Sequence, residues 1–159
     1  WEDKRESNLL DGFAHFYDTY ECSDNKFIAV GSIEPQFYSE LLDKLEIDDK
    51  RFQDQHNKDL WPELKEIMTL KIKSKSRSEW VDIFSDSDAC VSPVLSMDEA
   101  QQHPHNLERE AFINIDGFNQ PNASPRYSKT TPEIKHNAKE VGADLDDVCR
   151  EFNLCKDLF

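Results

Sequence analysis

The amino-acid sequence predicts an α+β fold, in which a small domain with a β-hairpin, short strands and several helices is followed by an extended tail and a C-terminal helix. Two runs rich in aromatic and β-branched residues, Phe16–Cys22 and Lys26–Gly31, flank a short polar segment, which is typical of a hairpin. Apolar residues then recur at helical spacing in several segments. The stretch Pro121–Pro132 is rich in Pro, Ser and Thr and has no apolar period, so we expect it to be extended.

The first predicted helix begins directly after the hairpin. Pro35 suits the first helical position, because the N–H that proline lacks would be unpaired there in any case. The apolar residues that follow at helical spacing predict a face turned toward a core; they are Phe37, Tyr38, Leu41, Leu42 and Leu45. The polar segment 46–59 predicts a loop, and a second helix follows with an inner face made of Leu64, Ile67, Met68 and Ile72.

A helix-start signal and a proline organise the next part of the chain. Ser76 and Glu79 have the spacing of a capping box, which opens a third helix with the apolar residues Trp80, Val81, Ile83 and Phe84. The apolar segment 89–95 predicts a short strand. Pro93 places that strand at a sheet edge, because proline cannot donate a hydrogen bond to a neighbouring strand.

The last third of the sequence carries weaker signals. Ser96 and Glu99 form a second capping box, which opens a short helix that ends near Pro104. Residues 109–120 predict a strand and a turn at Asp116-Gly117. The last helix is expected at about residues 143–152, where apolar residues recur at helical spacing.

Composition excludes several classes of function. The net charge is −14, and the 19 Lys and Arg residues are scattered among acids rather than clustered, so we expect neither nucleic acid nor an anionic membrane as a partner. No apolar run approaches the roughly 20 residues that span a bilayer. The four cysteines, Cys22, Cys90, Cys149 and Cys155, form no C-x-x-C pair, and we interpret them as free thiols in a reducing compartment.

The familiar signatures of enzymes and metal sites are missing from the sequence. None of the four glycines forms a G-x-G arrangement, and neither a G-x-S-x-G elbow nor an H-E-x-x-H helix occurs. His103 and His105, with Cys90 and Asp98 upstream, offer no third ligand at a convincing spacing. We therefore expect a solvated loop at these histidines and no metal.

Glu34, in the stretch "AVGSIEPQFYSELL", has two interpretations. As the residue before a proline it favours an extended backbone, so it lies at a strand-to-helix corner, where functional side chains often occur. A carboxylate there can also simply stabilise the helix N-terminus, by about 0.3–1 kcal/mol. From the residues alone the helix-end charge is favoured, although Glu is not among the preferred capping residues.

The pair Asp11-Gly12 is the second candidate. It lies within "NLLDGFAHFYDTY", where apolar and aromatic residues precede the hairpin. The segment either lines an apolar pocket or is an ordinary turn packed onto the sheet, and the turn is the favoured interpretation.

These same stretches carry a family resemblance. "NLLDGFAHFYDTY" and "AVGSIEPQFYSELL" resemble a segment of the α-methylacyl-CoA racemases, which belong to the family III CoA-transferase superfamily. Later pieces of that pattern follow in the same order, as "WPELKEI", "DACVSPVL" and "SPRYSKT". The resemblance covers about Asn8 to Thr130. It implies the family III CoA-transferase fold in the full-length protein.

The resemblance also implies a reaction. Such enzymes invert the configuration of a 2-methylacyl-CoA thioester by removing and returning the α-proton through an enolate. They need no cofactor beyond the CoA of the substrate. Their two bases, a His and an Asp, lie in a large domain upstream of the matching segment. The chain would therefore act as an isomerase only with that domain, and by itself it is expected to be inactive.

Carried over residue by residue, the resemblance gives four positions a role. Glu34 falls on the glutamate that hydrogen-bonds the catalytic histidine, where it would fix the tautomer of the imidazole. Leu9, Tyr17 and Ile33 fall where the family lines the acyl-chain pocket.

Two positions depart from the family pattern. Phe13 replaces the second glycine of a D-G-G motif, so a positive φ there would strain it, and its ring would narrow the acyl pocket. His15 replaces a proline. Both changes bear on substrate range.

Domain organisation follows from the same resemblance. Residues 1–8 are expected to lead in from the large domain, residues 9–120 to form the small α+β domain, and residues 121–159 to return to the large domain and pack a helix on it. The family's subunits form interlocked homodimers, and in a eukaryote the expected compartment is the peroxisome or mitochondrion. Two alternatives remain: part of a family III CoA transferase with an aspartate nucleophile, or a non-catalytic remnant that acts as an interaction module.

Overall fold

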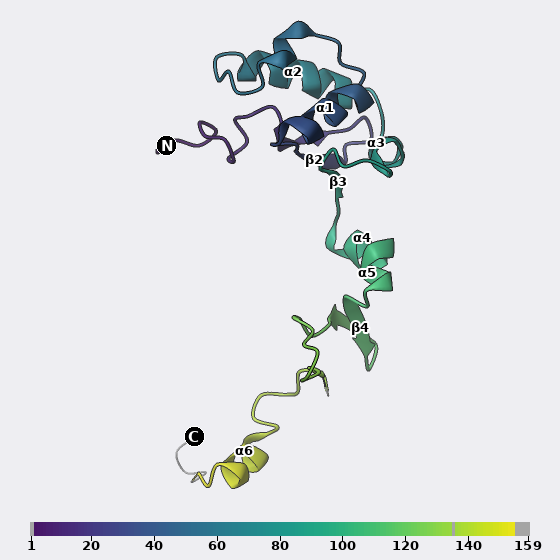
Figure 1. Cartoon of the computed structure of the whole chain (residues 1–159). Coiled ribbons are helices and arrows are strands. Elements are labelled where there is room, and N and C mark those ends of the chain that lie inside the picture. The colour runs from purple at the N-terminus through teal and green to yellow at the C-terminus, as the bar shows by residue number, and fades with distance from the viewer. Residues whose placement is uncertain (1, 135, 155–159) are drawn as a thin grey trace. The chain divides into compact units, whose positions relative to one another are not determined.

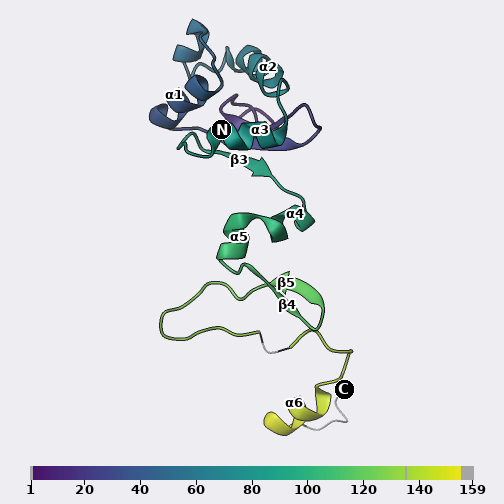
Figure 2. The same ribbon diagram turned by 90° about the vertical axis from the view of Figure 1, so that its right-hand side faces the viewer.

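The computed structural model describes residues 2–134 and 136–154. Contacts divide the chain into two compact units, an N-terminal unit that ends at Ser96 and a C-terminal unit that begins at Met97 (Figures 1 and 2). The sequence-based division has its boundaries after residues 8 and 120, whereas the contacts place residues 97–120 in the C-terminal unit. The mixed helical and antiparallel architecture agrees with the predicted α+β class.

A three-stranded antiparallel sheet forms the base of the N-terminal unit. Its strands β1 (Tyr17–Glu21), β2 (Phe27–Gly31) and β3 (Val91–Val94) lie in the order β1-β2-β3. The predicted hairpin is therefore confirmed. Strand β3 lies at the sheet edge, as Pro93 predicts, since an edge position leaves the missing donor without consequence.

Three α-helices cover this sheet, and their bounds agree closely with the predictions. They are α1 (Pro35–Lys44), α2 (Trp61–Ile72) and α3 (Arg77–Phe84). The capping box at Ser76 is complete, because its hydroxyl accepts from the Glu79 N–H while Glu79 accepts from the Ser76 N–H. A short 3₁₀ helix, η1 (Lys50–Gln53), interrupts the segment predicted to be a loop.

The core of the N-terminal unit lies between the helices and the sheet. Tyr38, Leu41 and Leu45 of the first predicted stripe are buried, as are Leu64, Met68 and Ile72 of the second. Two tryptophans share this core, and each indole N–H is satisfied: Trp61 donates to the Gln55 carbonyl at 2.8 Å and Trp80 to the Ile72 carbonyl at 2.7 Å. Phe52 of η1 is also buried, which explains why part of the polar segment folds onto the core.

The C-terminal unit consists of short elements. It contains α4 (Met97–Gln102), α5 (Pro104–Glu108), the hairpin β4 (Phe112–Ile115) and β5 (Phe118–Pro121), and α6 (Leu145–Glu151). The predicted turn is confirmed, with Asp116 and Gly117 both at positive φ, as a tight hairpin turn requires. Helix α4 stops before Pro104, but Pro104 then opens α5, because proline suits a first helical position.

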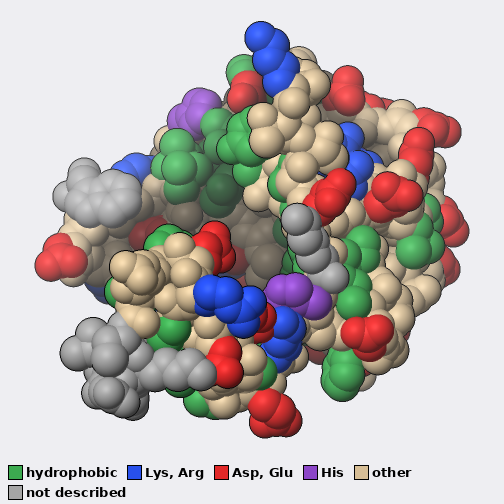
Figure 3. All heavy atoms as spheres, turned by 90° about the horizontal axis from the view of Figure 1, so that it is seen from below, with side chains coloured by type: hydrophobic (Ala, Val, Ile, Leu, Met, Phe, Trp, Pro, Cys, Tyr) green, Lys and Arg blue, Asp and Glu red, His purple; other side chains and the backbone are tan. Residues whose placement is uncertain are grey.

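Few of the described side chains are buried in the C-terminal unit. Residues 122–134 contain no helix or strand, as predicted for the extended stretch. Among the described residues of this unit, Cys149 is the single buried hydrophobic side chain. Large hydrophobic side chains are exposed instead, including Leu107, Phe118, Tyr127 and Phe152. Figure 3 shows hydrophobic side chains open at the surface among acidic ones.

Candidate functional site

Glu34 occupies the corner between β2 and α1. It is the N-cap residue of α1, with φ −74° and ψ 141°, so the backbone is extended as the following proline requires. Its carbonyl accepts a hydrogen bond from the Tyr38 N–H at 2.9 Å, which begins the helix. Its side chain is exposed and accepts no capping hydrogen bond from the helix N-terminus. Within residues 2–134 and 136–154 the carboxylate has no hydrogen bond or ion pair.

Cys90 lies close enough to this corner for the charge of Glu34 to act on its thiol. Its carbonyl accepts from the Gly31 N–H at 2.9 Å, which joins the residue before β3 to the end of β2. Burial raises the pKa of the Cys90 thiol, and the negative charge of Glu34 raises it further. The thiol is therefore protonated at neutral pH, which argues against a nucleophilic role for Cys90.

A depression of about 450 Å³ lies on the sheet beside this corner. Tyr17, Gly31, Ala29 and Cys90 belong to its lining. Tyr17 pairs with Gly31 across β1 and β2, and a Cβ at Gly31 would stand 3.8 Å from the tyrosine ring. The absence of a side chain at Gly31 thus keeps the ring edge accessible.

The structure separates the other two predicted pocket residues from this depression. Leu9 and Ile33 are half-buried and pack against the core, as does Tyr17, but neither of the two lines the depression on the sheet. Ile33 directly precedes Glu34 in the chain, so it shares the corner.

Asp11 and Gly12 form a turn, which is the favoured interpretation of that pair. The Asp11 carboxylate accepts hydrogen bonds from the Ser7 and Asn8 N–H groups and from the Asn8 side chain. Burial alone would raise the pKa of Asp11, but these hydrogen bonds outweigh it and hold the pKa below its ordinary value. Gly12 has φ +89° and also lines the depression, so the turn borders the pocket surface.

The two departures from the family pattern are accommodated. The positive φ falls on Gly12, and Phe13 is not among the residues with positive φ, so the expected strain at Phe13 does not arise. The Phe13 ring packs edge-on against Trp61 at 5.3 Å between centroids. It lines a second depression, of about 640 Å³, which also includes Lys65 and Leu70.

His15 is fully buried. Its Nε2 lies 2.7 Å from the Tyr38 hydroxyl, while its Nδ1 has no hydrogen-bond partner among the described residues. Burial lowers the pKa of His15 to about 4, with a further contribution from His56. The imidazole is therefore neutral at pH 7 and belongs to the aromatic core rather than to an open site.

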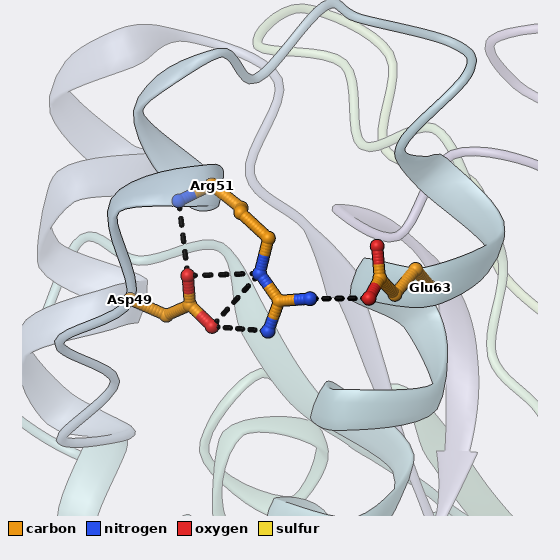
Figure 4. A network of polar contacts seen from close by, with 3 residues as sticks. All are labelled: Asp49, Arg51 and Glu63. Carbon is orange, nitrogen blue, oxygen red and sulfur yellow. Dashed lines mark hydrogen bonds and ion pairs between the residues drawn. The ribbon is translucent and has the colours of Figure 1, made fainter.

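A polar network joins η1 to α2 (Figure 4). Arg51 forms ion pairs with Asp49 at the start of η1 and with Glu63 in α2. Hydrogen bonds from Arg51 lower the pKa of Asp49 to about 2. The network links η1 to α2. Because the positive charge of Arg51 is already neutralised by these carboxylates, Arg51 is a poor binding group for an anionic ligand.

The histidines weighed as metal ligands lie in the C-terminal unit. His103 is the N-cap residue of α5, and His105 lies within that helix. Over residues 2–134 and 136–154, no cluster of three or more His, Cys, Asp or Glu side chains is placed to hold a metal ion. Cys22, Cys90 and Cys149 are free thiols, while Cys155 lies outside the described residues. No helix in the described part of the chain is long and apolar enough to cross a membrane.

The fold places the chain in a known structural class. The crystal structure of Rv3272 from Mycobacterium tuberculosis superposes with a TM-score of 0.63 at 17% sequence identity, covering 76% of this chain and 34% of that one. Residues 2–145 match the sequence model of CoA-transferase family III. The chain belongs to this family.

Curated relatives cover almost the whole chain. It is 40% identical to the alpha-methylacyl-CoA racemase of Mus musculus over 161 residues, and 37% identical to that of Homo sapiens over 162 residues. Each match covers 99% of this chain and 42% of the relative, so the chain spans less than half the length of these enzymes.

Sequence reasoning missed one feature of the site. Gln55, in the segment predicted to be a loop, is buried and contacts the residues directly before Glu34. A single glutamine in a polar segment carries no periodic or motif signal, so its role depends on a tertiary contact that local patterns do not encode.

Proposed function

We propose that the chain is the small-domain part of an α-methylacyl-CoA racemase. The support is the identity of 37–40% to two such enzymes over 99% of the chain. The geometry of the β2–α1 corner adds a site that suits this chemistry, because it presents a carboxylate without a partner among the described residues.

The proposed reaction is the inversion of a 2-methylacyl-CoA thioester. One base removes the α-proton, the electron pair of the C–H bond passes into an enolate, and a second base returns a proton to the opposite face. The thioester carbonyl delocalises the charge, and preorganised dipoles stabilise it. No cofactor takes part besides the CoA of the substrate, and the two bases, a His and an Asp, belong to the large domain.

Glu34 acts on the histidine base rather than on the substrate. A carboxylate that accepts from one ring N–H fixes the tautomer and raises the basicity of the other nitrogen. The single observation that carries this role is the exposed, extended position of Glu34 with no capping hydrogen bond. A carboxylate that served only the helix N-terminus would be expected to accept from it.

Tyr17, Leu9 and Ile33 provide the apolar side of the acyl site in this proposal. All three are half-buried against the core, which leaves part of each side chain for contact with an acyl chain. In the full-length enzyme the subunits form an interlocked homodimer, and the exposed apolar residues of the C-terminal unit pack on the large domain. The proposed compartment is the peroxisome or mitochondrion.

A CoA-transferase activity is the second candidate. The chain is 31% identical over 121 residues to a CaiB/baiF CoA-transferase family protein of Caenorhabditis elegans, which covers 74% of the chain. The racemase relatives match with higher identity and over a longer segment, so we favour the racemase.

The test is a reassembled enzyme, in which the chain replaces the matching segment of the mouse racemase. We expect this enzyme to incorporate deuterium at C2 of a 2-methylacyl-CoA in D₂O, and the chain alone to give no more than a buffer blank. Exchange by the chain alone would show that it carries its own bases. Transfer of CoA to a free acid, without exchange at C2, would favour the second candidate.

A further inference from the structure

Gln55 is a buried side-chain amide at the corner that carries Glu34. Only 7% of the residue is exposed, although it lies in the connection between η1 and α2. Its Nε2 donates to the carbonyl of Ser32 at 3.1 Å and to the carbonyl of Ile33 at 2.9 Å. These are the two peptide carbonyls directly before Glu34. One amide therefore uses both of its N–H groups on the backbone that leads into the candidate site.

Ser32, the first of these two residues, also makes hydrogen bonds to the segments that precede β1 and β3. The Ser32 N–H donates to the Phe16 carbonyl at 3.0 Å, and the Ser32 hydroxyl donates to the Ala89 carbonyl. Ser32 is fully buried, so water cannot replace a hydrogen-bond partner that its polar groups lose. The corner is thus fixed by hydrogen bonds to Phe16, directly before β1, to Ala89, two residues before β3, and from Gln55.

Gln55 is itself held in place. The buried indole N–H of Trp61 donates to the backbone carbonyl of Gln55 at 2.8 Å. The contacts of Arg51 with Asp49 and Glu63 join the two elements on either side of the connection that contains Gln55 (Figure 4). The amide is therefore presented by a connection that is tied at both of its ends.

We propose that Gln55 is a positioning residue for the racemase reaction: its side-chain amide holds the carbonyls of Ser32 and Ile33 and thereby fixes the direction in which Glu34 reaches the histidine base. This inference rests on the proposed function. Gln55 touches neither substrate nor reacting atoms, and it acts entirely through the backbone of the corner.

The side chain at position 55 can be changed without changing its length. Gln55→Met keeps an unbranched chain of similar size but removes both donors, which leaves the carbonyls of Ser32 and Ile33 without this partner. Gln53→Met is the matched control, since Gln53 is exposed in the same short segment. Gln55→Asn is a second variant, which keeps the amide but shortens its reach by one methylene.

The experiment measures C2 deuterium exchange in the reassembled enzyme for these variants, alone and combined with Glu34→Gln. We expect Gln55→Met to lower kcat about tenfold, the factor expected from the loss of one to two hydrogen bonds, with KM within about twofold of wild type. Gln55→Asn should also lower kcat with little change in KM, and Gln53→Met should leave both constants unchanged. On the Glu34→Gln background, Gln55→Met should add less than about a twofold loss, because the residue through which it acts is already disabled.

Each outcome separates this inference from the proposed function. Exchange slowed by Glu34→Gln but unchanged by both Gln55 variants would overturn the inference alone. A full tenfold loss on the Glu34→Gln background would also overturn it, since Gln55 would then act independently of Glu34. Unchanged exchange in Glu34→Gln would overturn the role assigned to Glu34, and the inference would fall with it.

Discussion

The N-terminal and C-terminal units use the same kinds of apolar residue in opposite ways. In the N-terminal unit the helical stripes and both described tryptophans are buried around one core, whereas in the C-terminal unit Cys149 is the single buried hydrophobic side chain among the described residues. Leu64 of α2 is 0% exposed, while Leu107 of α5 is 56% exposed. Among the described residues, contacts within the chain therefore build an extensive core in the N-terminal unit, and this is the unit that carries Glu34.

The largest expected effect tests this difference with one residue type. Leu64→Ala should lower the free energy of unfolding by about 3 kcal/mol, because it removes buried methyl groups and leaves a cavity. Leu107→Ala should change the free energy of unfolding by less than about 0.5 kcal/mol, since the Leu107 side chain is largely exposed. Denaturant unfolding followed by the fluorescence of the buried tryptophans measures both. Equal losses would show that the C-terminal unit shares the same core.

An effect of similar size concerns the buried His15. Its folded pKa of about 4 lies below the ordinary value of 6.5, so the unfolded chain takes up the proton first. The contribution of neutral His15 to the free energy of unfolding is fully present above pH 6.5. It is lost as the pH drops toward 4, by about 3 kcal/mol between pH 7 and pH 4. His15→Leu should remove this part of the pH dependence.

His105→Leu is the matched control for this measurement, because His105 is exposed in the C-terminal unit. Urea unfolding at several pH values between 7 and 4 gives the slope for each variant. A slope in His15→Leu as steep as in the wild type would contradict the assignment of the pH dependence to this buried imidazole.

The smallest effect compares two glycines within the N-terminal unit. Gly12 has φ +89°, and a Cβ there would stand 3.2 Å from the Asp18 carboxylate, so Gly12→Ala should cost about 1–2 kcal/mol. A Cβ at Gly31 would meet its neighbours at ordinary contact distance, and Gly31→Ala should cost less than about 0.5 kcal/mol. Thermal unfolding measures the pair. A greater loss at Gly31 would show that the sheet is packed more tightly there.

The elements with strong local signals were predictable from the sequence. The hairpin, the capping box at Ser76, the edge position of Pro93 and the turn at Asp116-Gly117 each depend on neighbours in sequence, and all are present. Helix η1 and α5 were not predicted. The first forms because Phe52 reaches the core, and the second because Pro104, which ends one helix, also opens another.

The candidate site was predictable only in part. The extended backbone of Glu34 follows from the proline after it, whereas the freedom of its carboxylate is visible only in the structure. Gln55 contacts residues more than twenty positions away, which no local pattern specifies. At Phe13 the sequence predicted a feature that the structure lacks. The expected backbone strain is absent, because the positive φ falls on Gly12.

The most direct measurement is the exchange of the α-proton by the Glu34→Gln variant of the reassembled enzyme. If the N-terminal unit serves the reaction by presenting this carboxylate to the histidine base, C2 deuterium incorporation should fall by about one to two orders of magnitude, the loss expected for a group that orients a catalytic residue. An exchange rate equal to that of the unsubstituted enzyme would contradict this account and leave Glu34 as a charge at the end of a helix.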